Sequence, residues 1–174
     1  DTVWSLIQNK PLKEKNNYVY SDLGLYISKR IAEKIAGVPL DKFVNSMFYA
    51  PLGMQTTCFN PLNNFDKSQI VPTENDNYFR YQTVQGYVHD MGAAMMGGVE
   101  GHAGLFSNAE DLAILYQMLL NGGNYGGQQY LPEQTINAWT KKQSSISRRG
   151  MGFDKPDLIN TSPCSQYASA QTFG

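Results

Sequence analysis

The sequence predicts an α+β fold that is predominantly helical. Two observations support this prediction: apolar residues recur at helical spacing in several stretches bounded by capping signals, and short segments typical of strands come only near the end. A chain of 174 residues is long enough for one domain with its own core. We therefore expect a single unit that is helical over about 1–143 and begins a sheet over about 148–174.

The first predicted helix runs from Asp22 to Ala36. Its apolar positions recur at steps of three and four and predict a buried stripe: Leu23, Tyr26, Ile27, Ile31 and Ile35. Ser21 or Asp22 can cap its N-terminus, and Gly37, followed by Pro39, is typical of a helix end.

A second helix is expected from Leu40 to Tyr49, with Pro51 ending it and the PLGM run making a turn. Its predicted buried residues are Phe43, Val44, Met47 and Phe48. The following segment, 60–90, is rich in Pro, Asn and Asp and lacks a sustained period. We expect a long irregular loop there, either the wall of a site or a disordered excursion, and its aromatic residues favour a packed loop.

Two further helices follow. Ser107 with Glu110 forms the pattern of a capping box, and an apolar stripe then runs to the glycine pair at 122–123: Leu112, Leu115, Tyr116 and Leu119. The last helix is expected from Pro132 to about Lys142, with Ile136 and Trp139 inward. Short strands are expected at 150–154 (GMGFD) and from 172 (TFG).

Composition and charge exclude several classes of protein. The net charge of −1 gives no reason to expect nucleic acid, and no apolar run reaches the length of a membrane span. His89 and His102 lack metal-ligand spacing, so we expect no metal and no cofactor. Cys58 and Cys164 are either buried thiols or one disulfide. The chain begins without Met and stops within YASAQTFG, from which we expect an internal piece of a longer protein.

The candidate chemistry lies at Tyr20, Ser21 and Asp22, where the first helix begins. A helix N-terminus carries partial positive charge, but a phenol with a reference pKa near 10 needs an adjacent cation to act as a base near neutrality. The sequence shows no such cation beside Tyr20. For this tripeptide taken alone, the plainer interpretation is a packing tyrosine followed by a common helix cap. The glycines around His102 favour a tight turn over an anion-binding loop, with His102 either bordering a cleft or hydrogen-bonded within the turn.

The order of these motifs resembles the serine β-lactamase and penicillin-binding protein superfamily. The resemblance rests on Tyr-Ser-Asp, the helix that follows, PLGM and the GHAGLFSNAEDLA run, and it extends from about Tyr18 to Phe173. It is nearest to the branch of class C β-lactamases, D-alanyl-D-alanine carboxypeptidases and related esterases. It implies an antiparallel sheet flanked by helices, with the active site between sheet and helical part. Similar domains also follow a glycoside hydrolase family 3 β-N-acetylglucosaminidase in one chain, so a covalently linked glycosidase is a possible partner.

The resemblance implies covalent acyl transfer by three motifs: Ser-x-x-Lys, Tyr-x-Asn and Lys-Thr-Gly or His-Thr-Gly. Tyr20 matches the tyrosine that moves protons, and Asp22 stands where the family usually has asparagine. Ser21, Asp22 and His102 are the candidate substrate-binding residues. The other two motifs do not occur, so we expect this chain alone to be inactive and the complete protein to hydrolyse amide or ester bonds.

By the same resemblance, peptidoglycan-derived peptides or β-lactams are the expected substrates and the location is periplasmic or otherwise extracytoplasmic. An ionised aspartate offers only acceptors, whereas asparagine also donates. Asp22 therefore keeps open a second hypothesis, a non-catalytic module that binds cell-wall peptide or sugar beside a glycosidase.

Overall fold

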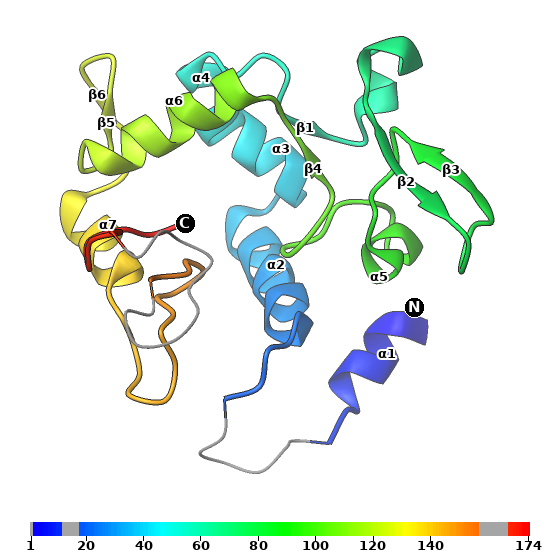
Figure 1. The fold of residues 1–174 in the computed structure, drawn as a ribbon, viewed down its shortest axis with the longest axis horizontal. Helices are drawn as coiled ribbons and strands as arrows, with labels where there is room; N and C mark the ends of the chain where they lie inside the picture. Colours follow the sequence, from blue (N-terminus) through cyan, green and yellow to red (C-terminus); the bar gives the residue numbers. More distant parts are fainter. Residues whose placement is uncertain (1, 12–17, 157–166) are drawn as a thin grey trace. The chain divides into compact units, whose positions relative to one another are not determined.

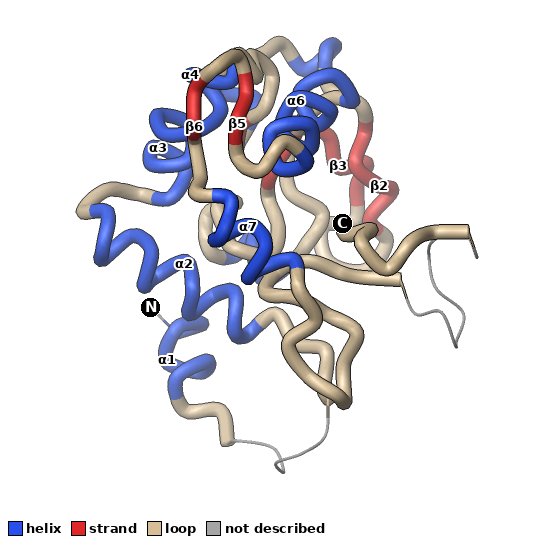
Figure 2. Tube along the Cα trace, turned by 90° about the vertical axis from the view of Figure 1, so that its left-hand side faces the viewer, coloured by secondary structure: helices blue, strands red, loops and turns tan. Residues whose placement is uncertain are grey.

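The structure is a computed structural model that describes residues 2–11, 18–156 and 167–174. Helices and short antiparallel strand pairs make up its regular structure (Figures 1 and 2), which confirms the predicted α+β class. The chain divides into two compact units. The first comprises Asp1–Leu12 and Ser21–Leu115, and the second comprises Lys13–Tyr20 and Tyr116–Gly174.

The α-helices of the described residues are α1 Thr2–Gln8, α2 Leu23–Ala36, α3 Leu40–Val44, α4 Ala50–Leu52, α5 Met91–Met95, α6 Ala109–Leu120 and α7 Glu133–Thr140. A π-helix, Asn45–Tyr49, joins α3 to α4, and two 3₁₀ turns lie at Pro61–Asn63 and Lys67–Gln69. The strands pair as β1 Cys58–Phe59 with β4 Leu105–Phe106, β2 Pro72–Asp76 with β3 Gln82–Gln85, and β5 Asn124–Tyr125 with β6 Gln128–Gln129.

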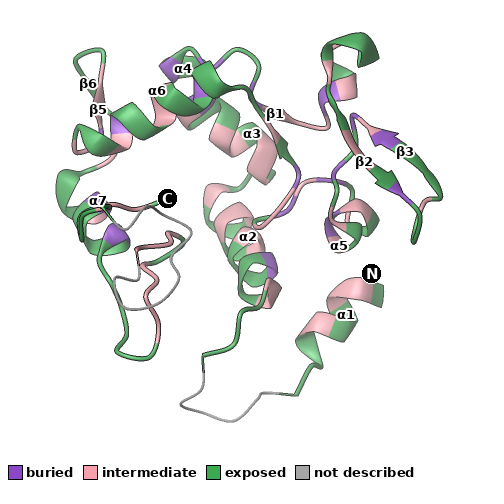
Figure 3. Ribbon diagram, in the orientation of Figure 1, coloured by how far each residue is buried: buried purple, intermediate pink, exposed green. Residues whose placement is uncertain are grey.

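Helix α2 forms where the periodic pattern predicts it. Gly37 has a φ of 73°, and its N–H donates to the carbonyl of Glu33 at 2.8 Å, so it ends the helix as a left-handed glycine. Of the predicted stripe only Tyr26 is buried, and the stripe is exposed at Ile27, Ile31 and Ile35 (Figure 3). The predicted helix is therefore confirmed, whereas the burial expected of its apolar stripe holds at Tyr26 and not at these three isoleucines.

The second predicted helix continues beyond Tyr49. Pro51 lies inside α4 and does not end the run, which stops only at Gly53, whose φ is 79°. A proline in a helix lacks a donor and crowds the preceding turn, and the wider π turn directly before it relieves that conflict. The buried residues here are Tyr49 and Leu52, whereas Met47, predicted to be inside, is exposed.

Residues 72–85 form a β-hairpin where a loop was expected. Strands β2 and β3 pair antiparallel, with Asp76 opposite Gln82 and Glu74 opposite Val84. The segment is therefore more regular than its composition predicts. Its aromatic residues are not packed inside: Tyr78 and Tyr81 are strongly exposed, which contradicts the predicted packed loop.

Helix α6 begins with a different cap from the predicted one. The side chain of Asn108 accepts the N–H of Asp111 at 2.8 Å, whereas the Ser107 hydroxyl lies 2.7 Å from that of Thr57. The capping box at Ser107 is therefore wrong by one residue. On the inner face Met118 is buried, while Leu112 of the predicted stripe is exposed.

The second unit ends without the predicted strands. Ile136 of α7 is buried as predicted, but Trp139 is exposed. No residue of 148–156 or 167–174 lies in a strand. Instead Asp154 and Gly174 exchange two backbone hydrogen bonds, at 2.5 and 3.2 Å, the pattern of one antiparallel residue pair.

Candidate active site

Tyr20 lies in the second unit with its ring open to solvent. The residue is 67% exposed, so its hydroxyl can be reached from outside. The guanidinium of Arg149 lies 5.0 Å from the ring centroid, close enough for a cation–π contact. The sequence could not indicate this contact, because 128 residues lie between Tyr20 and Arg149 in the chain.

Asp154 orders the two arginines that follow α7. Arg148 donates to both carboxylate oxygens of Asp154, at 2.6 and 2.7 Å, and Arg149 donates to one of them at 3.4 Å. These bonds, the Arg148 bonds first, hold the pKa of Asp154 at about 2. The same carboxylate therefore fixes the stretch of chain that carries Arg149 over Tyr20.

Ser21 and Asp22 belong to the first unit and precede α2. Asp22 occupies the N-cap position, but its side chain makes no capping hydrogen bond. The Ser21 hydroxyl instead accepts the N–H of Leu23 at 3.3 Å. Of the two predicted caps, only Ser21 thus satisfies a helix donor, and the Asp22 carboxylate has no capping role.

His102 is held inside the first unit by Asp90. Its side chain is 5% exposed, and its Nε2 lies 3.1 Å from Oδ1 of Asp90. The ring packs against the ring of Tyr26 with centroids 4.4 Å apart. Burial would raise the pKa of Asp90, but the N–H of Ala93 and the His102 ring outweigh it and lower that pKa.

Tyr26 is the buried centre of this region. Burial raises its pKa to about 12, with further contributions from the carboxylates of Asp90, Glu100 and Asp22. At neutral pH the phenol is therefore a neutral group and not a base. Glu100, whose side chain is 1% exposed, is paired with Lys29 of α2 at 3.2 Å.

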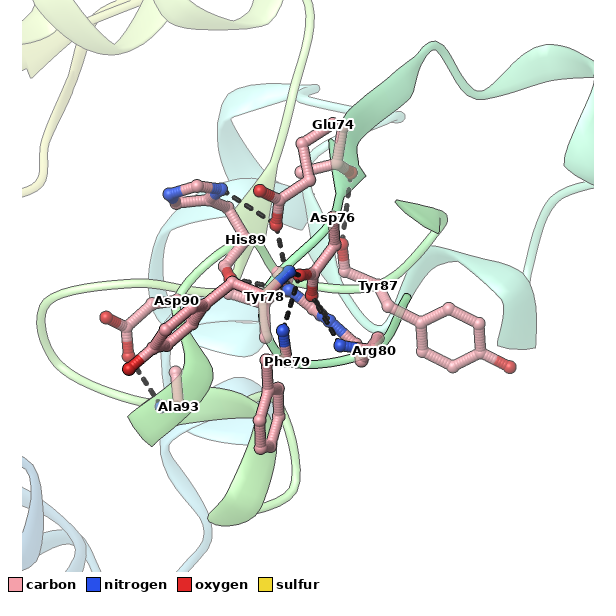
Figure 4. Close-up of polar contacts among 11 residues, drawn as sticks. Glu74, Asp76, Tyr78, Phe79, Arg80, Tyr87, His89, Asp90 and Ala93 are labelled. Carbon is pink, nitrogen blue, oxygen red and sulfur yellow. Dashed lines mark hydrogen bonds and ion pairs between the residues drawn. The ribbon is translucent and has the colours of Figure 1, made fainter. Parts of the chain in front are cut away.

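A second polar network stiffens the β2–β3 hairpin (Figure 4). The carboxylate of Asp76 accepts three successive backbone N–H groups, those of Tyr78, Phe79 and Arg80, at 2.8–2.9 Å. The guanidinium of Arg80 donates to Asp76, Glu74 and the carbonyls of Val88 and His89. The bond from Phe79, followed by that from Arg80, holds the pKa of Asp76 far below its usual range. The charged groups of this network pair with one another and with nearby backbone groups, and these bonds order the loop.

The structure brings together some of the predicted residues and adds others. Around Tyr26 it groups His102 with three residues that the sequence analysis missed: Asp90, Glu100 and Lys29. Only the position of Asp90 before the short helix α5, as a helix cap, carries a sequence signal for any of them. The roles assigned to Tyr20, Ser21, Asp22 and His102 remain predictions.

Neither a metal site nor a membrane span is found within the described ranges. They contain no group of three His, Cys, Asp or Glu side chains placed to hold a metal ion. None of the helices described is long and apolar enough to cross a bilayer. Cys58 is half-buried, and Cys164 lies outside the described residues, so their pairing stays open.

Comparison with known proteins gives consistent matches. The family model described as Beta-lactamase matches residues 1–158. A "Putative D-alanyl-D-alanine carboxypeptidase" of Salmonella heidelberg strain SL476 is 36% identical over 188 residues, which cover 99% of this chain and 44% of that protein. The chain thus spans less than half the length of this relative.

Two solved structures share the fold. The "putative beta-lactamase" from Bacteroides dorei superposes with a TM-score of 0.61 at 17% identity, covering 88% of this chain and 44% of that one. A penicillin binding protein from Bacillus halodurans gives a TM-score of 0.59 at 14% identity, covering 87% and 45%. At these identities the superpositions concern the fold alone.

Proposed function

This chain belongs to the beta-lactamase family, and from that premise we propose that the complete protein is a serine-dependent acyl-transfer hydrolase of amide or ester bonds. The family resemblance predicted from the sequence is confirmed by the family match. In such a reaction a serine hydroxyl attacks the acyl carbon, the bond to the leaving amine or alcohol breaks, and water then releases the acyl group.

Within this proposal Tyr20 transfers the proton between nucleophile and leaving group. The observation that supports it is the accessible ring of Tyr20 with the Arg149 guanidinium 5.0 Å from its centroid. An acid–base group must reach the reacting atoms, and a tyrosine in the protein core could not. Ser21 and Asp22, which follow it in the chain, lie on the substrate side in this proposal, and His102 supports them.

This chain holds neither Ser-x-x-Lys nor Lys-Thr-Gly or His-Thr-Gly. In the proposal, the missing segments come from the complete protein, and the chain alone is inactive. Peptidoglycan-derived peptides or β-lactams are the proposed substrates, because the relative named above carries a carboxypeptidase name. An extracytoplasmic location and a linked glycoside hydrolase belong to the same proposal.

The test is acyl transfer by the complete protein. We expect covalent labelling by a fluorescent penicillin or hydrolysis of nitrocefin, with Tyr20→Phe lowering turnover at least about a hundredfold. Tyr18→Phe is the matched control, because Tyr18 is also exposed and lies two residues earlier. Equal rates in wild type and Tyr20→Phe would remove Tyr20 from the mechanism.

The second candidate is a non-catalytic binding module, which Asp22 favours because its carboxylate only accepts hydrogen bonds. The same experiment separates the two. Reversible binding of cell-wall peptide or sugar, with neither labelling nor turnover in the complete protein, would favour the module and contradict the hydrolase.

A further inference from the structure

The stretch Glu100–Gly101–His102 lies along the first two turns of α2. Gly101 faces the backbone of Leu25, where an added methyl carbon would lie 2.5 Å from the carbonyl oxygen. The next residue, His102, packs on Tyr26, and Glu100 pairs with Lys29 one turn further on. Contacts at positions 25, 26 and 29 therefore hold this side of the helix from outside.

Asp90 connects this stretch to α5. Its Oδ1 accepts the N–H of Ala93 at 2.6 Å, which caps α5 (Figure 4), and the same oxygen lies 3.1 Å from His102 Nε2. Gly92, the second residue of α5, lies against the hydroxyl of Tyr26. We call Asp90, Glu100, Gly101 and His102 together the α2 clamp.

The hydrogen bonds indicate which ring nitrogen of His102 carries the proton. Its Nδ1 is buried and has no hydrogen-bond partner among the described residues. A proton on Nδ1 would therefore be a buried donor without an acceptor, which is costly, whereas a proton on Nε2 points at Asp90. The geometry therefore favours a proton on Nε2 that is donated to Asp90, and it leaves Nδ1 as a buried acceptor without a partner among the described residues.

The clamp contacts the first turns of α2, where the Ser21 hydroxyl accepts the N–H of Leu23 and the side chain of Asp22 makes no capping bond. The N–H groups of Leu25 and Tyr26 both donate to the carbonyl of Asp22, and no side-chain bond from Asp22 caps the turn. First turns are the part of a helix that frays, so contacts at Leu25 and Tyr26 decide how firmly residues 21 and 22 are placed.

We propose that Asp90 and His102 are positioning residues, which act through Tyr26 to fix the start of α2 and with it Ser21 and Asp22. This inference rests on the proposed function only in that Ser21 and Asp22 face the substrate. His102 then supports substrate binding without touching the substrate, as its burial and its bond to Asp90 require.

The kinetic test uses the complete protein and two substitutions at one position. His102→Phe keeps a ring against Tyr26 but removes the donor to Asp90, whereas His102→Gln keeps a donor. We expect His102→Phe to lower kcat/KM for nitrocefin about tenfold to a hundredfold per titrated active site, with a raised KM. His102→Gln should stay within about threefold of wild type, because the bond that sets the geometry is kept.

His89→Gln is the matched control, since His89 is the other histidine of the chain and is well exposed. It should leave both kinetic constants unchanged. Because rates are counted per titrated site, loss of folded protein cannot imitate the effect. If His102→Phe and His102→Gln are equally impaired or equally active, the positioning role is wrong.

Two measurements test the clamp without any enzymatic activity. Amide hydrogen exchange of Leu25 and Tyr26 should be faster in His102→Phe than in wild type, while that of Ile136 in α7 is unchanged. Nitrogen-15 NMR of the wild-type protein should show a proton on Nε2 of His102. Unchanged exchange at Leu25 and Tyr26, or a proton on Nδ1, would overturn the proposal.

These measurements also separate the two possible failures. If the complete protein is neither labelled by penicillin nor able to turn over nitrocefin, the proposed function is wrong. Hydrogen exchange and NMR still test whether the α2 clamp fixes the start of α2. If His102→Phe does not fold, the tautomer of His102 in the wild-type protein is the test of the α2 clamp.

Discussion

Replacing Gly101 with alanine tests how closely the α2 clamp packs against its helix. The added methyl carbon would lie 2.5 Å from the carbonyl oxygen of Leu25 and 3.2 Å from its carbonyl carbon. Real side chains essentially never come within 3.0 Å of such an atom. The oxygen belongs to helix backbone and cannot rotate away, so either the loop or α2 must shift.

The expected change in the free energy of unfolding follows from two opposing effects. Forcing an extra methyl into a packed contact costs about 1–3 kcal/mol. Alanine also restricts the unfolded chain, which returns about 0.4–1 kcal/mol, and Gly101 lacks the positive φ that would add strain. We therefore expect Gly101→Ala to lower the free energy of unfolding by about 1–2 kcal/mol.

Gly24→Ala is the matched control, because Gly24 lies in the same helix and nothing is within 4 Å of its added carbon. It should raise the free energy of unfolding by about 0.5–1 kcal/mol through helix propensity. The assay is urea unfolding of the complete protein followed by circular dichroism. If Gly101→Ala is as stable as wild type while Gly24→Ala is stabilised, the close approach of the loop to Leu25 is refuted.

Three further predictions follow from buried and paired side chains. Gly92→Ala places a methyl against the Tyr26 hydroxyl, and Tyr26→Phe removes that oxygen. In a double-mutant cycle measured by urea unfolding, adding Tyr26→Phe to Gly92→Ala should therefore recover about 1 kcal/mol of the free energy of unfolding. Strictly additive losses would contradict the contact. Tyr26 should ionise near pH 12 in the folded protein, and not at its ordinary 10.0, as followed by ultraviolet absorbance at alkaline pH. Because its folded pKa is the higher one, its contribution to stability is complete below pH 10 and is lost as the pH rises through about 12; a native transition near 10 would argue against its burial. Asp154 has a folded pKa of about 2 against an ordinary 3.8, so its contribution is present above pH 4 and is lost as the pH falls through 2. Arg148→Gln should therefore cost about 1 kcal/mol at pH 7, a value reduced for solvent screening, and less at pH 2.5; an equal cost at both would exclude the ion pair as its source.

Local patterns predicted the helices better than the faces they bury. The periodicity of α2 and its terminal Gly37 act within a few residues, so the sequence contains all that is needed to place the helix. Whether Ile31 or Ile35 is covered depends on what packs against them, and a periodic pattern contains no such information. The same reason explains why Trp139 and Met47 were wrongly placed inside.

The β2–β3 hairpin could not be predicted, because its strands lack an apolar alternation. PTEND and QTVQ are polar on both sides, and only Val84 of β3 is buried. The hairpin is held instead by Asp76 and Arg80, whose partners include the carbonyl of Val88 beyond the second strand. Such an arrangement depends on tertiary hydrogen bonds, which no local propensity reports.

In the candidate site, too, local sequence features were found, whereas contacts between residues distant in the chain were not. Tyr20, Ser21 and Asp22 were found because they adjoin a recognisable helix start and match a family motif. Asp90 lies 12 residues from His102, and Arg149 lies far from Tyr20 in the chain, so no spacing connects either pair. Only the fold brings these partners together, which is why the sequence analysis left His102 open between a cleft residue and a turn residue.

The start of α2 links stability to chemistry. A side-chain cap contributes about 1 kcal/mol to a helix, yet the carboxylate of Asp22 makes no such bond. The contacts of Gly101, His102 and Glu100 on the first two turns support the helix from outside. Asp22 is thus free of a capping duty, and its charge gains only a few tenths of a kcal/mol from the helix dipole. Aspartate and asparagine at residue 22 therefore differ little in what they do for the helix. The difference between them lies in the ligand groups that each can recognise, since one only accepts hydrogen bonds and the other also donates them.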